Sequence, residues 1–448
     1  MRQDVFASSQ MLVFSPILKE NADVRSQYFS YLKTVTRRMK REKRKYTKAQ
    51  LAFYKEILCG EAPLYPSRNN VIPSRFCYLI PYDLAAMFAY RSDVLSTEKI
   101  AVVISKMVSD FHLPANSASF LWREFDAALG DTEAWEDVLS SKAVSGFKRY
   151  LKLVKENIGF IRQSPYSILI TATMSAGKST LINALVGKNI SLMQNMACTS
   201  KIHRIVSKPF KDGVSSEYDH DLLLNASKED LLNDNADNRS AKITVGTYFN
   251  GLLGGRRVVL LDSPGVNSSE NQEHREISYQ MIRSRKYKLL LYVMNATQLG
   301  TNDEEQHLEA VKKYMGRAKI LFIINRVDNL ISEEDNLPDI IENQRRFLCS
   351  KGFKHPLICP VSARAAFLAK KSQQEELSRI ERREINSFID KFELIDLPGY
   401  YENQLQCSAI SNSNNEIKSL LKNCGFAYLE QIIMHLRNGG KINGTGLC

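Results

Sequence analysis

One stretch decides the fold of this chain: Ala172-Thr173-Met174-Ser175-Ala176-Gly177-Lys178-Ser179-Thr180. It fits the phosphate-binding loop (P-loop) pattern GxxxxGK(S/T), except that Ala172 stands where the pattern has its first glycine. The apolar run SILIT precedes it and the helical pattern TLINALVG follows it. A loop between a strand and a helix directs backbone N–H groups and a helix N-terminus at phosphate oxygens. We therefore expect residues 173–180 to bind a polyphosphate, with Lys178 on the β- and γ-phosphates and the Ser179 hydroxyl on Mg²⁺.

Short apolar runs alternate with helical stretches around and after this loop. The runs are SILITA at 167–172, KITVGTYF at 242–249, RVVLLD at 257–262, YKLLLYVMN at 287–295, KILFIIN at 319–325 and PLICPVS at 356–362. Buried strands separated by helices predict an α/β fold with a mostly parallel sheet. The polar segment 211–241 is interpreted as a loop or insertion.

Helical periodicity dominates the part of the chain before the sheet. IAVVISKMVSDF and ASFLWREFDAAL place apolar residues three and four positions apart, which indicates amphipathic helices. We expect a mostly helical N-terminal domain at 1–144, a P-loop α/β domain at 145–438, and a loose tail at 439–448.

Two later sites predict the metal shell and the γ-phosphate contact. VVLLDSPG ends a strand with the DxxG arrangement of Asp262 and Gly265. Asp262 can hold Mg²⁺ through water, and the Gly265 N–H can contact the γ-phosphate. Thr199, in MACTSK, lies where a switch threonine could complete the Mg²⁺ shell. Asp396 begins a second DxPG, but it follows the base-reading element in the chain, and we interpret it as a loop residue.

The base is predicted from the ends of two further strands. Asn325-Arg326-Val327-Asp328 follows KILFII and fits (N/T)KxD with Arg in place of Lys. The Asp328 carboxylate can accept hydrogen bonds from N1–H and the exocyclic amine of guanine, and adenine offers no such pair of donors. Ser362-Ala363 follows another strand and fits the loop that closes over the base. In this order, each at a strand end, the motifs predict a GTP-binding domain.

Composition and charge limit the other classes of protein. Apolar residues make up 44% and charged residues 25% of the 448 residues, as in folded globular proteins. The chain has neither an apolar run that could span a bilayer nor a secretory signal pattern. Its eight cysteines are scattered without a CxxC pair, so we expect neither a zinc site nor a disulfide framework, and a cytoplasmic location.

The net charge of +12 is concentrated near the N-terminus. Residues 33–48 hold nine basic side chains and one acidic one, which leaves +8 in this segment. A solvated helical face is the plainest interpretation. Contact with an anionic membrane surface, which would place the protein peripherally at a membrane, and contact with nucleic acid stay open, nucleic acid being the less favoured partner.

These residues also resemble a known family. Ser175-Ala176-Gly177-Lys178-Ser179, the DSPG followed by Val266, and YVMNATQLGTNDE at 292–304 resemble the dynamin-type GTPases, particularly their bacterial members. The resemblance covers roughly 145–438, and LLKNCGFAYLEQIIMHL is similar to the helix that ends such domains.

The resemblance implies a hydrolase that converts GTP to GDP and phosphate with Mg²⁺. It implies catalytic roles for Lys178, for Thr199 in placing the water, and for Ser175 in holding a K⁺ or Na⁺ ion that offsets transition-state charge. It also implies a homodimer through the GTP domains, so that self-association activates hydrolysis. Val266 cannot orient water as the glutamine of Ras-like enzymes does, and Met174 stands where animal members carry glutamine.

Three further expectations remain open. Dynamins continue into a helical stalk and a membrane-binding element, whereas only a short tail remains here. Either the helical N-terminal part supplies assembly contacts or the chain lacks the membrane machinery. A ribosome-linked GTPase that grips RNA through its basic N-terminal region would show RNA-stimulated turnover and salt-sensitive binding. A GTP-loaded switch with negligible turnover would recruit a partner through residues 200–280.

Overall fold

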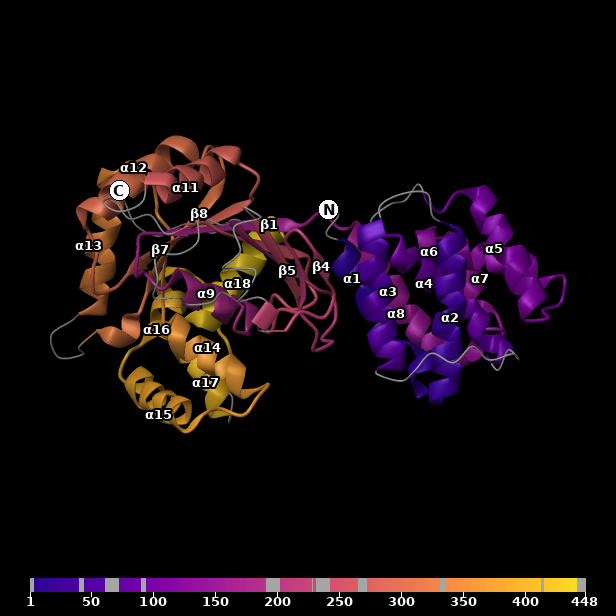
Figure 1. Ribbon diagram of the computed structural model, residues 1–448. Helices are drawn as coiled ribbons and strands as arrows, with labels where there is room; N and C mark the ends of the chain where they lie inside the picture. Colours follow the sequence, from indigo (N-terminus) through magenta and orange to yellow (C-terminus); the bar gives the residue numbers. More distant parts are fainter. Residues whose placement is uncertain are drawn as a thin grey trace. The chain divides into compact units, whose positions relative to one another are not determined.

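The computed structural model describes residues 4–39, 44–60, 72–89, 94–190, 202–227, 229–230, 242–264, 272–330, 336–411 and 415–440. Contacts divide the chain into two compact units (Figure 1). The first, here called the helical unit, is Met1–Ser164 with Lys208–Ser227, and the second, the α/β unit, is Pro165–Ser207 with Lys228–Cys448. Within the described ranges, no helix combines the length and apolar character needed to cross a membrane.

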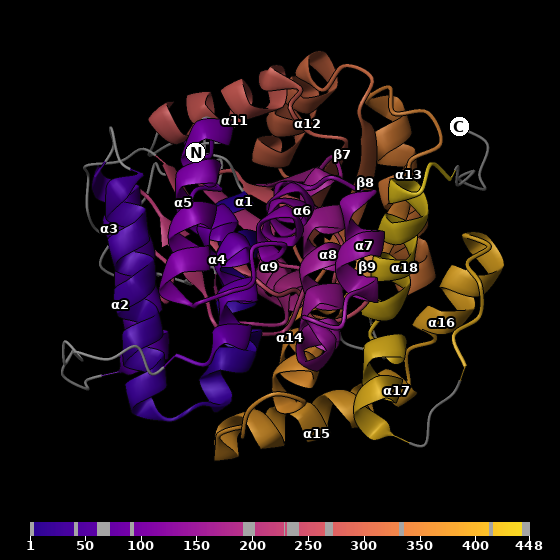
Figure 2. The same ribbon diagram turned by 90° about the vertical axis from the view of Figure 1, so that its right-hand side faces the viewer.

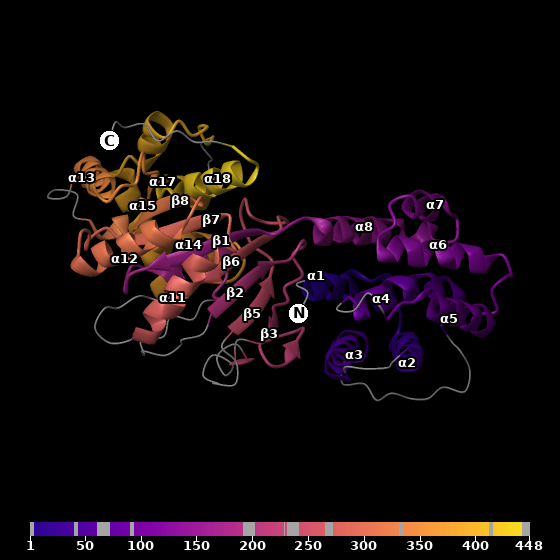
Figure 3. The ribbon, with the colours of Figure 1, turned by 90° about the horizontal axis from the view of Figure 1, so that it is seen from above.

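The helical unit is built from α-helices with short 3-10 turns. Its elements are α1 (Asp4–Gln10), η1 (Met11–Phe14), η2 (Pro16–Lys19), α2 (Ala22–Arg38), α3 (Arg44–Cys59), η3 (Ser74–Leu79), α4 (Ile80–Met87), α5 (Thr97–Asp110), α6 (Ser117–Leu129), α7 (Ala134–Ser140), η4 (Ser145–Phe147) and α8 (Lys148–Arg162). Helices α2 and α3 lie side by side (Figures 1 and 3). Local chemistry sets several boundaries: the Asn21 side chain accepts from Val24 N at 3.0 Å and starts α2, and Gly130, with φ +99°, ends α6 in a left-handed cap.

The boundary of this unit differs from the expected 144/145 division. Helix α8 lies with the helical unit because its apolar side, including Tyr150, Leu151 and Val154, belongs to that unit's core. The segment 208–227 also lies there. It contains the antiparallel pair β3 (Ser216–Tyr218) and β4 (Leu222–Leu223). Of the two interpretations of 211–241, loop or insertion, this part therefore fits an insertion that carries two short strands.

The α/β unit contains a mostly parallel sheet, so the predicted fold class is confirmed. Its strands run in the order β5-β2-β6-β1-β7-β8-β9 (Figures 1 and 3). They are β1 (Tyr166–Ala172), β2 (Ile202–Ser207), β5 (Lys242–Thr247), β6 (Val258–Asp262), β7 (Leu289–Asn295), β8 (Lys319–Asn325) and β9 (Ile358–Val361). Among the described pairs in this order, β2 and β6 are antiparallel and the others are parallel. All residues of β7 are buried, as expected of a strand in the centre of a parallel sheet.

Helices cover both faces of this sheet. They are α9 (Lys178–Val186), α11 (Gln272–Ser284), α12 (Asn302–Tyr314), α13 (Leu337–Ser350), α14 (Ala363–Ser372), α15 (Arg379–Glu393), α16 (Leu397–Gly399), α17 (Glu416–Asn423) and α18 (Phe426–Arg437), with the single turns η5 (Val327–Asn329) and η6 (Tyr400–Gln404). Helices α11 and α12 lie on one face and α9 and α14 on the other (Figure 1). Helices α14, α15 and α17 lie together (Figures 1 and 2).

The cysteines show one departure from expectation. Cys349, in the last turn of α13, is disulfide-bonded, although the sequence suggested no disulfide. Free thiols among the described residues are those of Cys59, Cys77, Cys359, Cys407 and Cys424.

Candidate functional site

The P-loop joins the end of β1 to the start of α9. Two residues turn the chain there with left-handed backbone angles, Ser175 (φ +60°) and Gly177 (φ +81°), and Gly177 is the N-cap of α9. A Cβ at Gly177 would lie 2.3 Å from Asn325 Nδ2, so only glycine fits both the angle and the space. Met174 is 55% exposed, and Ser175 is exposed beside it. The rim of the loop therefore faces outward.

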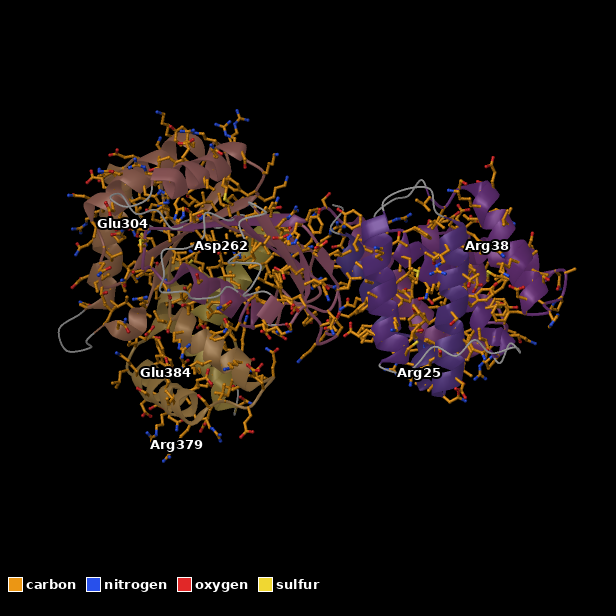
Figure 4. All side chains as sticks on the ribbon, in the orientation of Figure 1. Arg25, Arg38, Asp262, Glu304, Arg379 and Glu384 are labelled. Carbon is orange, nitrogen blue, oxygen red and sulfur yellow. The ribbon has the colours of Figure 1, made fainter. Side chains whose placement is uncertain are left out.

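Lys178 and Asp262 form an ion pair at the base of this loop. Lys178 Nζ contacts Asp262 Oδ1, and the side chains are 14% and 9% exposed. Figure 4 labels Asp262, which ends β6, the parallel neighbour of β1. Ser263 N and Oγ donate to Ile170 O at 3.2 and 3.0 Å, which fixes the end of β6 against β1. Ser179 and Thr180 are half-buried in the first turn of α9.

Asn325 connects the P-loop to the two loops expected to read the base. Its Nδ2 donates to Ala176 O at 2.9 Å, and its Oδ1 accepts from Ala363 N at 3.0 Å. Because Asn325 is 2% exposed, these bonds are shielded from water and hold the three strand ends together. The Ser362 hydroxyl accepts from Ala365 N at 3.2 Å and caps α14, so this side chain has a structural use.

Asp328 has an unsatisfied carboxylate oxygen. Its Oδ1 is buried and has no hydrogen-bond partner among the residues that the structure describes. Arg326, two residues earlier, has φ +65°, an uncommon angle for a residue with a side chain. A buried acceptor without a donor is costly unless a ligand supplies one, so Asp328 marks a place for a hydrogen-bond donor.

Helix α15 contacts both base-side loops, which the sequence alone did not reveal. Lys391 Nζ contacts Asp328 O. Arg364 Nε and Nη2 donate to the two carboxylate oxygens of Glu384, each at 2.8 Å, and this pairing raises the pKa of Arg364. Figure 4 labels Glu384 on this helix. Both α15 residues lie far along the chain from Asp328, and only their helical pattern was visible in the sequence.

A buried polar cluster lies behind the P-loop and was also missed. His307 Nε2 and Thr171 Oγ1 are 2.9 Å apart, and Ser278 Oγ is 3.4 Å from Thr171 Oγ1. The His307 ring stacks on Tyr279 with centroids 5.9 Å apart. Complete burial lowers the pKa of His307 to about 4, so the imidazole is neutral at neutral pH and joins β1 to α12 through a hydrogen bond.

Some of the remaining predicted residues lie in the P-loop or in a helix cap, and others lie outside the described part of the chain. Thr173 is half-buried and Ala176 is buried in the P-loop. Asp396 caps the short helix α16, because its Oδ1 accepts from Gly399 N at 2.7 Å. Thr199, Gly265 and Val266 lie outside the described residues.

Comparisons with known proteins agree with this geometry. Residues 168–327 match the model of the dynamin family. This match confirms the resemblance to the dynamin-type P-loop GTPases for this segment of the chain.

Curated relatives are more distant. The chain is 26% identical over 258 residues to an uncharacterised protein in the xynA 3′ region of Caldicellulosiruptor sp. (strain Rt8B.4), covering 55% of this chain and 60% of that protein. It is 25% identical over 230 residues to the GTPase Era of Haemophilus influenzae, covering 50% and 56%. The chain thus spans little more than half the length of these relatives.

Solved structures give weak similarity. An oligomerised bacterial dynamin pair, described as providing a mechanism for long-range sensing and tethering of membranes, has 15% identity and a TM-score of 0.38, over 95% of this chain and 63% of that one. An Era structure from Aquifex aeolicus bound to GDP and AlF4⁻ has 16% identity and a TM-score of 0.27, over 45% and 52%.

Proposed function

We propose that this chain binds GTP and hydrolyses it to GDP and phosphate. The observation that carries the proposal is the Asp328 carboxylate oxygen, which is buried without a donor and lies in the loop that Asn325 ties to the P-loop. Guanine offers two donors on one edge, N1–H and the exocyclic amine, so it satisfies this acceptor. Adenine presents no such pair.

The phosphates would lie at the P-loop. The backbone N–H groups of residues 173–178 and the N-terminus of α9 stabilise negative charge there. Lys178 reaches the β- and γ-phosphates, and the Gly265 N–H contacts the γ-phosphate. Because Lys178 starts α9 and is only 14% exposed, its charge acts in a weakly solvated position, where it is strong.

The oxygen donors nearby fit Mg²⁺. Ser179 is half-buried in the first turn of α9, and the Asp262 side chain is 9% exposed. Oxygen ligands and incomplete protein coordination are typical of Mg²⁺, which keeps phosphate and water ligands. In the described part of the chain, no group of three or more His, Cys, Asp or Glu could hold a metal by itself. Ser179, Asp262 and Thr199 would hold the ion, which neutralises phosphate charge.

The hydrolytic step is attack of water on the γ-phosphate. We assign Thr199 to placing this water and Ser175 to holding a K⁺ or Na⁺ ion. The exposed rim at Met174 and Ser175 leaves the reaction centre open on one side. A second GTP domain docking there would exclude water and supply the missing stabilisation, so hydrolysis would depend on self-association.

The base assignment is tested by titrating GTP, XTP and ATP into the protein and three variants. Lys178→Ala should bind GTP at least tenfold more weakly, since a charge-assisted bond to phosphate is lost. Asp328→Asn should weaken GTP and favour XTP, whose oxo group accepts from the new amide. Asp396→Asn is the matched control, because it keeps a capping side chain in the other DxPG. Unchanged GTP affinity in Asp328→Asn would disprove the base-reading role.

The mode of turnover is tested by measuring GTP hydrolysed per molecule against protein concentration, in K⁺ and in Na⁺. A specific activity that rises with concentration would support pairing of GTP domains. A flat, near-zero rate with tight GTP binding would favour the alternative of a GTP-loaded switch with negligible turnover. This alternative stays open because Met174 is exposed at the P-loop and cannot donate a hydrogen bond. Adding RNA or anionic vesicles would then test whether segment 33–48 recruits an activator, at a membrane surface or in the cytoplasm.

A further inference from the structure

The helical unit contains a cavity that the GTP site does not use. Its volume is about 230 Å³, and α1, α4, α6 and α8 contribute to its walls. These elements all belong to the helical unit. The cavity therefore belongs to that unit alone.

Small side chains keep this cavity open. One wall carries four alanines from α4, the turn after it and the end of α6: Ala85, Ala86, Ala89 and Ala128. Ile158 and Ile161 of α8 also line the cavity. Larger apolar residues at the alanine positions would fill the space, and protein cores normally leave few voids of this kind. The alanines and isoleucines give the cavity an apolar surface that suits the hydrocarbon part of a ligand.

The cavity has two buried polar atoms without a hydrogen-bond partner among the described residues, Asn157 Oδ1 and the Tyr82 hydroxyl. Asn157 lines it and is 2% exposed. Its Nδ2 donates to Ala7 O at 3.0 Å, whereas its Oδ1 has no partner among the residues that the structure describes. Asp83 also lines the cavity, but its carboxylate already accepts from Tyr28 at 2.5 Å and Tyr54 at 3.0 Å. A ligand hydroxyl would satisfy Asn157.

The mouth of the cavity carries a positive charge. Arg162 lies five residues after Asn157 on α8, about 7.5 Å along the helix axis, and is exposed. Its guanidinium packs on Gly130, where a Cβ would lie 2.5 Å from Nη2. No carboxylate in the described ranges pairs with it. Leu129, adjacent in the chain to Gly130, also lines the cavity and is 47% exposed, which gives the mouth an apolar edge beside the cation.

We propose that this cavity binds a medium-chain amphiphile with a hydroxyl group at one end and a carboxylate at the other. The chain lies between the alanines and the isoleucines. The hydroxyl donates to Asn157 Oδ1, and the carboxylate pairs with Arg162 at the mouth. An omega-hydroxy fatty acid has this chemistry.

Calorimetric titration of the full chain with three probes tests this site: omega-hydroxyoctanoate, octanoate and octylammonium. Omega-hydroxyoctanoate should bind about tenfold more tightly than octanoate, as one hydrogen bond to a buried acceptor provides. Octylammonium should bind weakest, because its charge repels Arg162. Equal binding of all three, or no saturable binding of any, would disprove the proposal.

Two variants locate the binding. Arg162→Glu changes an exposed residue, so the fold should persist. The variant should bind omega-hydroxyoctanoate and octanoate several-fold more weakly, and octylammonium should become the better ligand. Ala128→Phe should fill the cavity and abolish binding of all probes. Val102→Phe is the matched control, since Val102 is 63% exposed on α5 and does not line the cavity. If Arg162→Glu left the order of the probes unchanged, or if Val102→Phe abolished binding equally, the assignment would be wrong.

Discussion

At the scale of single residues, Glu304 provides the clearest pH-dependent test. It is 2% exposed in the first turn of α12, and its Oε2 accepts from Gly300 N at 2.7 Å. Burial raises the pKa of Glu304 from 4.5 to about 7. The folded state therefore binds a proton more tightly than the unfolded state, and stability falls as pH rises from about 4.5 to about 7.

Glu304→Gln should remove this part of the pH dependence while keeping an acceptor for Gly300. The free energy of unfolding, measured by urea titration from pH 4.5 to 7, should fall with pH less steeply in the variant than in the parent. Glu309→Gln, at an exposed position of the same helix, is the control. A variant with the slope of the parent would show that Glu304 titrates normally.

His307 acts in the opposite direction over a similar range. Its pKa is lowered from 6.5 to about 4, so its contribution is complete above pH 6.5 and is lost as pH falls towards 4. His307→Gln keeps a donor and an acceptor for Thr171 but does not titrate. We expect the acid limb of the stability curve, below pH 6.5, to become shallower in this variant, as urea unfolding at several pH values can measure.

At the scale of elements, α15 contacts the two loops that contain Asp328 and Ala363. Its Glu384 pairs with Arg364 beside Ala363, and its Lys391 contacts the backbone oxygen of Asp328. A capping box at Ser378 and Glu381 starts the helix firmly. If these contacts position the two loops, removing them should weaken guanine binding and leave phosphate binding at the P-loop unchanged.

Glu384→Gln and Lys391→Met should therefore each lower the affinity for GTP about two- to fivefold, because partly exposed charged contacts contribute little. The affinity for inorganic triphosphate should stay unchanged. Nucleotide titration followed by fluorescence measures both. Arg382→Gln is the matched control, because its contact with Glu376 is on the exposed side of α15. An equal loss for GTP and triphosphate would indicate general damage to the domain.

The strands of the α/β unit differ in how well their sequences predict them. β1, β7 and β8 were predictable because they are nearly continuous apolar runs, and the P-loop because its residues are adjacent in the chain. β2 was missed, since IHRIVS mixes His203 and Arg204 into a strand that runs antiparallel to β6. Glu384 and Lys391 meet the base loops only through tertiary packing, which no local pattern encodes.

At the scale of the whole molecule, the two units are interleaved along the chain. Residues 208–227 lie within the sequence of the α/β unit but pack in the helical unit. Phe14 and Phe210 rings lie 5.9 Å apart, and the Tyr46 and Tyr218 hydroxyls are 2.9 Å apart. Leu222 and Leu224 belong to the helical unit's core. The helical unit is therefore incomplete without this later segment.

Thermal unfolding should reveal this arrangement. Each unit has its own core, so we expect two transitions, of which only that of the α/β unit rises with added GTP. Leu224 is 4% exposed, so Leu224→Ala should reduce the unfolding free energy of the helical unit by about 2–5 kcal/mol. The midpoint temperature of the GTP-insensitive transition should fall accordingly. Ile205→Ala, 1% exposed on β2, is the matched control and should lower the GTP-sensitive one. If Leu224→Ala lowered the GTP-sensitive transition instead, residues 208–227 would belong with the α/β unit in solution.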